Sequence, residues 1–281
     1  MARSSPARTV PSTPRRPGRS RPVTFSILAR DPATGAIGLA ATTADLAVGA
    51  RVAFGRAGVG GVLTQHTTDP RLGPRGLDLL ASGLDARAAL AEVLAGATRP
   101  AARQLAVVDA GGRTAVYSGR FVDPRWCYSE AFDSFAVIGN VLASPAVGRA
   151  VADRYRAGEG EDLAARLVAA LRAGEEAGGE QSPLVSAALQ VHLEQPFPYV
   201  DVRVDSSPTP LVALAHLVEA TATKRDDYVR RALDPDVGYA SGYADTGVDL
   251  ETDLHLTSHP STDPRTDPRT DPSTDPEGDP R

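Results

Sequence analysis

The stretch TFSILARDPATGAIGLAAT, residues 24–42, decides how this chain begins to fold. Residues 24–30 and 36–42 are short apolar runs with the composition of strands. The DPATG segment that joins them supplies proline and glycine at positions where a tight turn uses them. The pattern therefore predicts a β-hairpin at the start of the folded region.

The chain on either side of the folded region has little to bury. Residues 1–22 are rich in Arg, Pro and Ser, with six arginines and no acidic residue. Residues 236–281 are a Gly-, Tyr- and Asp-containing linker followed by Thr-Asp-Pro repeats. Segments that bury no apolar surface cannot offset the entropy of ordering. We therefore predict a disordered leader at 1–22, a folded domain at 23–235, and a disordered linker and tail at 236–281.

Composition and charge exclude several classes of protein. Of the 281 residues, 42% are hydrophobic. No apolar run approaches the ~18 residues of a membrane span. Residues 1–22 also lack the apolar core of a secretory signal, so we expect a cytoplasmic protein. The net charge of -5 argues against nucleic acid as a partner. The single cysteine, Cys127, excludes an intrachain disulfide framework and a thiolate metal cluster.

Beyond the hairpin, the pattern alternates between groups of strands and pairs of helices. We predict strands at 24–30, 36–42, 50–57, 59–66, 103–110, 113–119, 135–142, 184–193 and 199–205. We predict helices at 73–83, 84–96, 144–158, 161–178 and 209–233. A parallel doubly wound sheet would need single strands and helices in alternation, so this order favours antiparallel sheets. The expected fold class is α+β, with two antiparallel sheets face to face and helices outside.

The common catalytic and cofactor motifs are absent from the sequence. It contains no GxGxxG after a predicted strand, no GxxxxGK[ST], no HExxH and no GxSxG. His192 lies within a predicted strand without a second His or Cys at ligand spacing, so we expect no metal and no cofactor. One known mechanism activates a hydroxyl nucleophile without a histidine as the base. In it, the α-amine of an N-terminal Thr or Ser takes the hydroxyl proton.

A series of motifs follows in a fixed order along residues 23–235. They are TFSILARDPATG, LAVGARVAFGRAGVGGVLTQ, TDPRLGPRGLDLLASGLDARAAL, RQLAVVDAGGRTAVYSG, GNVLAS, SAALQV and PYVDVRVDSSPTP. Together they resemble the bacterial family catalogued as domain of unknown function 1028. That family is similar to the N-terminal-nucleophile (Ntn) hydrolases. The resemblance implies a four-layer αββα sandwich and a nucleophilic Thr at the mature N-terminus, which corresponds to Thr24.

The chain departs from this family at its start. Members begin Met-Thr-Phe-Ser-Ile or close to it, whereas 23 residues precede Thr24. Only a free α-amine is basic, and the amide nitrogen that Thr24 has within a longer chain is not. We expect translation to start at Val23, because GTG encodes valine and also serves as a bacterial start codon. Two alternatives stay open: an Arg-rich leader that is cleaved in the cell, and a retained extension that leaves the protein inactive.

An amide hydrolase also needs N–H donors for the oxyanion. The best candidate is Asn140, which follows Gly139 at the end of a predicted buried strand. The alternative is an Asn that ends a strand through its turn preference. Gln65, at the end of VLTQ, and Thr42 or Thr43, after the second strand, are candidates to line the same cleft. The alternative is that each is an ordinary polar residue at the end of a strand.

Other polar residues have both a binding and a structural interpretation. Asp201, Arg203 and Asp205 alternate along VDVRVD and therefore share one face of a strand. They form either an ion-pair ladder or a site for a charged substrate. Ser186 is either packed between layers or close to the nucleophile. Arg71 and Arg75, which flank a loop in DPRLGPRG, are candidates to bind a substrate carboxylate.

These residues lead to one main hypothesis and two alternatives. The main hypothesis is a metal-independent Ntn-type hydrolase that cleaves a small C–N amide or ureido substrate, a class that rests on the resemblance. A non-catalytic small-molecule-binding module on the same fold is the first alternative. An interaction protein that uses its repeat tail is the second. As partners we expect a small-molecule substrate and a possible homo-oligomer, with no nucleic acid and no membrane.

Overall fold

The computed structural model describes residues 24–234. The predicted leader (1–22) and the whole of the predicted linker and tail (236–281) lie outside the described residues, as does Val23. The chain divides into one compact unit that ends at Val229 and a second that begins at Arg230. The architecture that follows is that of the first unit, except that the last residues of helix α6, from Arg230, are counted in the second.

Strands and helices follow one another in the groups that the sequence predicts. The strands are β1 (Thr24–Arg30), β2 (Ile37–Thr43), β3 (Ala53–Arg56), β4 (Gly60–His66), β5 (Arg103–Asp109), β6 (Thr114–Ser118), β7 (Tyr128–Ala131), β8 (Phe135–Asn140), β9 (Ser186–His192) and β10 (Val200–Val204). The α-helices are α1 (Leu72–Ala81), α2 (Ala86–Ala95), α3 (Ala146–Ala157), α4 (Leu163–Glu176), α5 (Pro210–Ala222) and α6 (Arg225–Leu233). Short 3₁₀ turns lie at Val48–Ala50, Pro100–Ala102 and Pro124–Trp126.

The strands form two antiparallel sheets. One sheet has six strands in the order β10-β9-β2-β1-β8-β7, and the other has four in the order β3-β4-β5-β6. The predicted hairpin is confirmed, since β1 pairs with β2 and Phe25 lies opposite Thr42. Its turn closes where Asp31 N–H donates to the carbonyl of Ala36 at 2.8 Å. Gly35 there adopts a φ of 77°, a conformation that glycine takes without strain.

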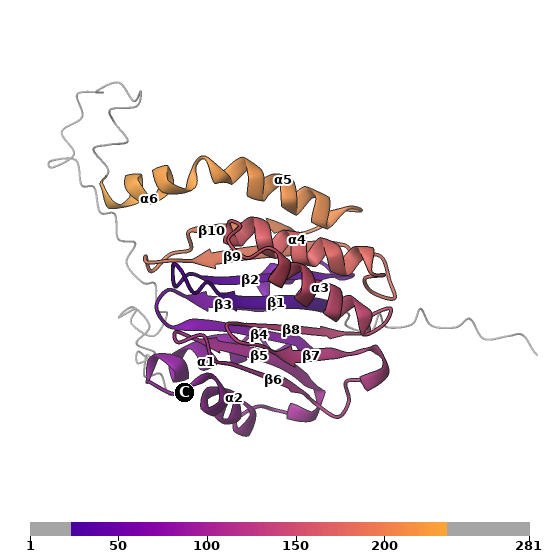
Figure 1. Cartoon of the computed structure of the whole chain (residues 1–281). Helices are drawn as coiled ribbons and strands as arrows, with labels where there is room; N and C mark the ends of the chain where they lie inside the picture. The colour runs from indigo at the N-terminus through magenta and orange to yellow at the C-terminus, as the bar shows by residue number, and fades with distance from the viewer. Residues whose placement is uncertain (1–23, 235–281) are drawn as a thin grey trace, which may run out of the picture. The chain divides into compact units, whose positions relative to one another are not determined.

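Three apolar layers hold the sheets and helices together (Figure 1). The first packs the six-stranded sheet against α3, α4 and α5, and includes Phe25 and Leu167. The second lies between the two sheets and includes Leu28 and Leu63. The third packs the four-stranded sheet against α1 and α2 and includes Leu105. Both sheets are thus covered on both faces, and the predicted α+β sandwich of two antiparallel sheets is confirmed.

Some predicted element boundaries were wrong. Strand β7 was not predicted, because its short YSEA segment shows no apolar alternation and two of its four residues are exposed. The helix predicted at 209–233 is two helices, α5 and α6, separated after Ala222. The strand predicted at 50–57 begins only at Ala53, because residues 48–50 form a 3₁₀ turn. Within residues 24–234, none of the helices combines the length and apolar character that crossing a bilayer requires.

Candidate functional site

Thr24 is the first residue of β1, a central strand of the six-stranded sheet. Strand β8 lies on one side of β1 and places Asn140 directly opposite Thr24. Strand β2 lies on the other side, and the hydroxyl of Thr24 is 3.4 Å from the hydroxyl of Thr43. Thr24 is buried, with 5% of its surface exposed. The fold therefore brings two of the predicted site residues together at one end of the inter-sheet layer.

Gln65 reaches this point from the other sheet. It lies near the end of β4, and its Nε2 donates to the carbonyl oxygen of Thr24 at 3.3 Å. Its Oε1 accepts a hydrogen bond from the hydroxyl of Ser26 at 2.7 Å. Both Ser26 and Gln65 are fully buried. Gln65 thus fixes the start of β1 against the four-stranded sheet.

Gln104, in β5, links the remaining members of the cluster. Its Oε1 accepts from Gln65 Nε2 at 2.8 Å and from Asn140 Nδ2 at 3.0 Å. Its Nε2 donates to the carbonyl of Gly139 at 3.0 Å. Gln104 was not among the predicted site residues, although a glutamine directly before the apolar run LAVV was a usable signal, because a buried amide must find partners.

Asn140 retains hydrogen-bonding capacity at the site. A primary amide carries two N–H donors and an oxygen with two lone pairs. Within residues 24–234, only one of its N–H groups has a partner, which is Gln104, and its Oδ1 has none. Asn140 is fully buried. Unused polar atoms are rare in protein interiors, and this one lies opposite Thr24.

Thr42 and Ser186 hold in place a segment that lines the site. The Thr42 hydroxyl donates to the carbonyl of Ser186 at 2.9 Å. The Ser186 hydroxyl donates to the carbonyl of Asp45 at 2.7 Å and accepts from Val48 N–H at 3.1 Å. These bonds fix the segment that follows β2. Asp45 and Val48 in turn line a small cavity beside Thr24.

Asp201 lies elsewhere. It is exposed on the edge strand β10, where Gln190 Nε2 lies 3.4 Å from its Oδ2. Along the same face, Arg203 and Asp205 form an exposed ion pair at 2.9 Å. The structure does not bring Asp201 to the Thr24 cluster.

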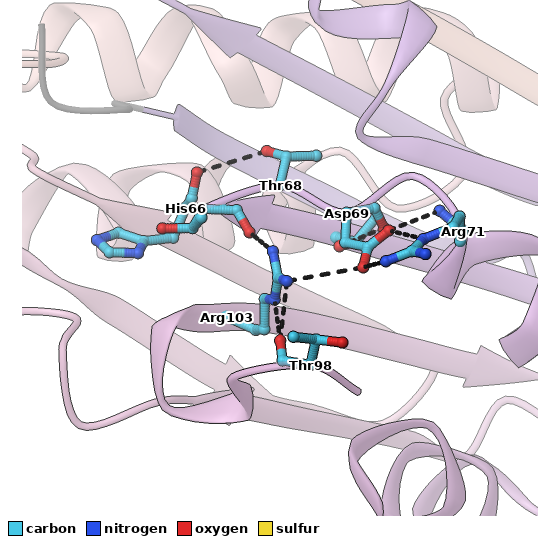
Figure 2. Close-up of polar contacts among 8 residues, drawn as sticks. His66, Thr68, Asp69, Arg71, Thr98 and Arg103 are labelled. Atoms are coloured by element: carbon cyan, nitrogen blue, oxygen red, sulfur yellow. Dashed lines mark hydrogen bonds and ion pairs between the residues drawn. The ribbon is translucent and has the colours of Figure 1, made fainter. Parts of the chain in front are cut away.

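The loop between β4 and α1 carries Thr68, which lines a cavity beside Thr24. Figure 2 shows the polar contacts that hold this loop. Asp69 is buried and accepts two hydrogen bonds from the Arg71 guanidinium, at 2.9 and 2.8 Å. Hydrogen bonds from Arg71, together with the charges of Arg71 and Arg103, hold the pKa of Asp69 below its usual value. The buried Arg103 of β5 also donates to the carbonyls of Thr67 and Thr98. This clamp holds Thr68 at the cavity beside Thr24. Arg71 is therefore engaged with Asp69.

The cavity at Thr24 is small. Its volume is about 30 Å³, and it is lined by Thr24, Thr43, Asp45, Val48, Arg51, Val52 and Thr68. That volume admits about one water molecule. A second cavity, of about 820 Å³, lies at the opposite end of β1, where Arg30, Tyr155 and Arg166 are among its lining residues.

Comparison with known proteins places the chain in a family. The sequence profile of DUF1028, described as a family of unknown function, matches residues 24–214. A crystal structure of a DUF1028 protein from Silicibacter pomeroyi is 34% identical, with a TM-score of 0.67, and the match covers 74% of this chain and 94% of that one. No curated protein gives a significant match. The chain therefore belongs to DUF1028, a family whose function is unknown.

Proposed function

We propose that this protein is an Ntn-type hydrolase that cleaves a small C–N amide or ureido substrate with Thr24 as its nucleophile. The observation that carries the proposal is the position of Thr24. It begins a central strand, opposite an Asn140 amide with an unused N–H, at the end of a layer between two antiparallel sheets. An Ntn nucleophile needs this combination of a strand-initial hydroxyl and a nearby amide donor.

The chemistry uses few groups. The Thr24 oxygen attacks the substrate carbonyl carbon, and the α-amine of Thr24 takes the hydroxyl proton. The free N–H of Asn140 donates to the oxyanion. The C–N bond then breaks as the amine leaving group takes the proton from the α-ammonium, which leaves an acyl ester on Thr24. Water hydrolyses this ester and restores the enzyme. The cavity of about 30 Å³ suits that water, so the substrate requires its wall to open.

The proposal predicts that activity appears only when Thr24 carries a free amine. In a variant with residues 20–23 replaced by Ile-Glu-Gly-Arg, factor Xa cleaves directly before Thr24. We expect this cleavage to switch on release of ammonia from a panel of small amides and ureido compounds. Thr24→Ala in the same background should lower the rate by at least about 10³-fold, because the nucleophile is lost.

A matched control places the cleavage one residue earlier. Replacing residues 19–22 by Ile-Glu-Gly-Arg leaves Val23 ahead of Thr24, and this form should stay inactive. Intact mass confirms the new N-terminus in both preparations. Equal activity of the two cleaved forms would contradict the proposal, and so would full activity of the Thr24→Ala protein.

The larger cavity favours a second candidate function, small-molecule binding without catalysis. Its volume of about 820 Å³ lies in the range of ligand pockets. Tyr155 and Arg166 there stack, with the guanidinium carbon 3.8 Å from the ring centre. A ligand found by thermal-shift screening should then bind equally well to wild type and to Thr24→Ala, and Arg166→Ala should weaken its binding.

A further inference from the structure

The segment 179–181, between α4 and β9, lies across the end of β1. Leu142, just past the end of β8, forms a β-bridge with Glu180. Next to it, Gln181 N–H donates to the carbonyl of Val141 at 3.3 Å. The segment is therefore attached to the strand that flanks β1 on one side.

The side chain of Glu180 reaches the strand that flanks β1 on the other side. Its Oε2 accepts from Ala44 N–H at 2.8 Å, just past the end of β2. The carbonyl of Thr43 faces β9, since it accepts from Val185 N–H at 2.8 Å. Because backbone groups alternate along a strand, Ala44 N–H points to the opposite side, toward β1.

The carboxyl group of Glu180 therefore lies in line with β1, just beyond its first residue. Strand β1 runs between β2 and β8, and its register places Thr24 next to Thr43 and Asn140. One step further along the same line are Ala44 and Val141, which the 179–181 segment joins. Thr24 is the first residue of β1, so its backbone nitrogen is at the end of the strand that faces this position.

Glu180 has an unused oxygen at this place. The residue is 8% exposed, and its Oε1 has no hydrogen-bond partner among the described residues. Burial raises the pKa of Glu180 well above its usual value, and one hydrogen bond from Ala44 opposes this only in part. Asp45 and Arg51, the charged side chains that line the cavity beside Thr24, are largely exposed, and the ion pair between them measures 3.8 Å. A buried carboxyl with an open oxygen lacks a cationic partner.

We propose that Glu180 binds the α-ammonium group of Thr24 and positions that amine beside the Thr24 hydroxyl. This inference rests on the proposed function, because it needs Thr24 to be the N-terminal residue. Glu180 acts through the amine and does not touch the substrate, so it is a positioning residue. The ammonium supplies the partner that Oε1 lacks, and the carboxylate fixes the direction in which the amine accepts the hydroxyl proton.

The pairing has a measurable electrostatic signature. A carboxylate within a few ångströms stabilises the ammonium form and raises the pKa of the amine. Glu180→Gln keeps an oxygen for Ala44 N–H but removes the charge. The amine pKa in that variant should fall by about one unit or more. In a hydrolase, the acidic limb of the kcat/KM profile should move to lower pH by the same amount, while the plateau falls about tenfold as the amine loses its orientation.

The amine can be titrated without any substrate. The chain contains one lysine, the exposed Lys224, so Lys224→Arg leaves the N-terminus as the only amine. The full chain is folded first, and factor Xa then exposes Thr24. All three apolar layers are built from residues after Thr24, so cleavage leaves them whole. The rate of acylation of Thr24 by acetic anhydride, followed by mass spectrometry from pH 5 to 10, gives the amine pKa.

Three variants separate the outcomes. We expect Glu180→Gln to lower the amine pKa, Glu180→Asp to restore part of the shift, and the exposed Glu176→Gln to leave it unchanged. An unchanged amine pKa in a Glu180→Gln protein with wild-type circular dichroism would overturn the inference, because a purely structural glutamate would not affect that titration. Absence of hydrolysis in every cleaved form would overturn the proposed function alone, since the titration needs no turnover.

Discussion

A single buried amide, Gln104, couples the residues around Thr24. Its Oε1 serves both Gln65 and Asn140, while its Nε2 is shared among acceptors that include the carbonyls of Gly139 and Tyr128. These groups come from strands of both sheets. Gln104 therefore determines which way the two neighbouring amides point, and so which N–H of Asn140 is left for a ligand.

We predict that Gln104→Leu lowers the free energy of unfolding by about 2–6 kcal/mol, because two buried amides lose their acceptor and each loss costs about 1–3 kcal/mol. Urea unfolding measures the loss. Thr114→Val is the matched control, since it removes one half-buried hydrogen bond, from the Thr114 hydroxyl to the carbonyl of Phe132. It should cost only about 1 kcal/mol. Equal losses in the two variants would show that Gln104 is not a central link.

At the scale of elements, ion pairs hold the loop between β4 and α1 in place, whereas apolar packing holds the neighbouring strands and helices. Asp69 is buried between the guanidinium groups of Arg71 and the buried Arg103. Arg103 also donates to the carbonyls of Thr67, in this loop, and of Thr98, in the segment after α2, so its guanidinium ties the loop to β5. Opening the cavity at Thr24 from its other wall, the segment that follows β2, requires the hydrogen bonds of Ser186 to Asp45 and Val48 to break.

We predict that Asp69→Asn destabilises the protein by about 3 kcal/mol at pH 7, because it leaves the buried Arg103 without its carboxylate. The pKa of Asp69 is lowered in the folded protein. Its contribution is therefore present above about pH 4, where the unfolded residue is ionised, and is lost as the pH falls further. The stability difference between wild type and variant should shrink between pH 5 and pH 2.5 in urea titrations. Asp78→Asn, in an exposed pair with Arg56, should change stability by less than about 1 kcal/mol.

At the scale of the whole molecule, His192 lies where the two sheets meet. Its ring, from β9, packs so closely over Gly55 of β3 that a Cβ there would lie 2.4 Å from the ring. Burial lowers the pKa of His192 to about 4. The imidazole is therefore neutral in the folded protein at pH 5 to 6, where an unfolded histidine already takes up a proton.

We predict that this difference drives acid destabilisation of the sandwich. The unfolded state binds more protons below its pKa of about 6.5, so stability falls as the pH drops from 6.5 toward 4, by about 3 kcal/mol in total. His192→Gln should flatten this part of the curve of unfolding free energy against pH. The exposed His216→Gln should leave it unchanged. An unaltered slope in the His192 variant would assign the acid sensitivity to other groups.

Most strands and helices were predicted from the local sequence, because each shows its own spacing of apolar residues and is bounded by turn residues. The hairpin at 24–42 and the strand that ends at Asn140 follow from a few neighbouring side chains. Strand β7 does not, since half of its residues face solvent. The pairing of Thr24 with Asn140 joins distant parts of the chain, and only the family resemblance suggested a shared site. Gln104 was recognisable in the sequence as a single amide side chain next to the apolar residues LAVV.

No feature of the sequence marked Glu180 as a site residue. It stands in the loop sequence GGEQSP, which has no period and no motif. Its position acquires meaning only after β1 is known to lie between β2 and β8, because the glutamate touches the ends of both neighbours. A role defined by sheet order is invisible in a single sequence.

The order of strands in the six-stranded sheet also has a kinetic consequence. Among the described strands, β1 is synthesised first. Its neighbour β8 is synthesised only after all four strands of the other sheet. Strand β9, which pairs with β2, is synthesised later still. Contacts between distant parts of a chain form slowly, because loop closure must precede the gain from pairing. During synthesis, Thr24 and Asn140 therefore meet only after most of the domain has left the ribosome. A nascent or truncated chain cannot assemble the proposed nucleophile with its amide donor, so any reactivity appears only with the finished fold.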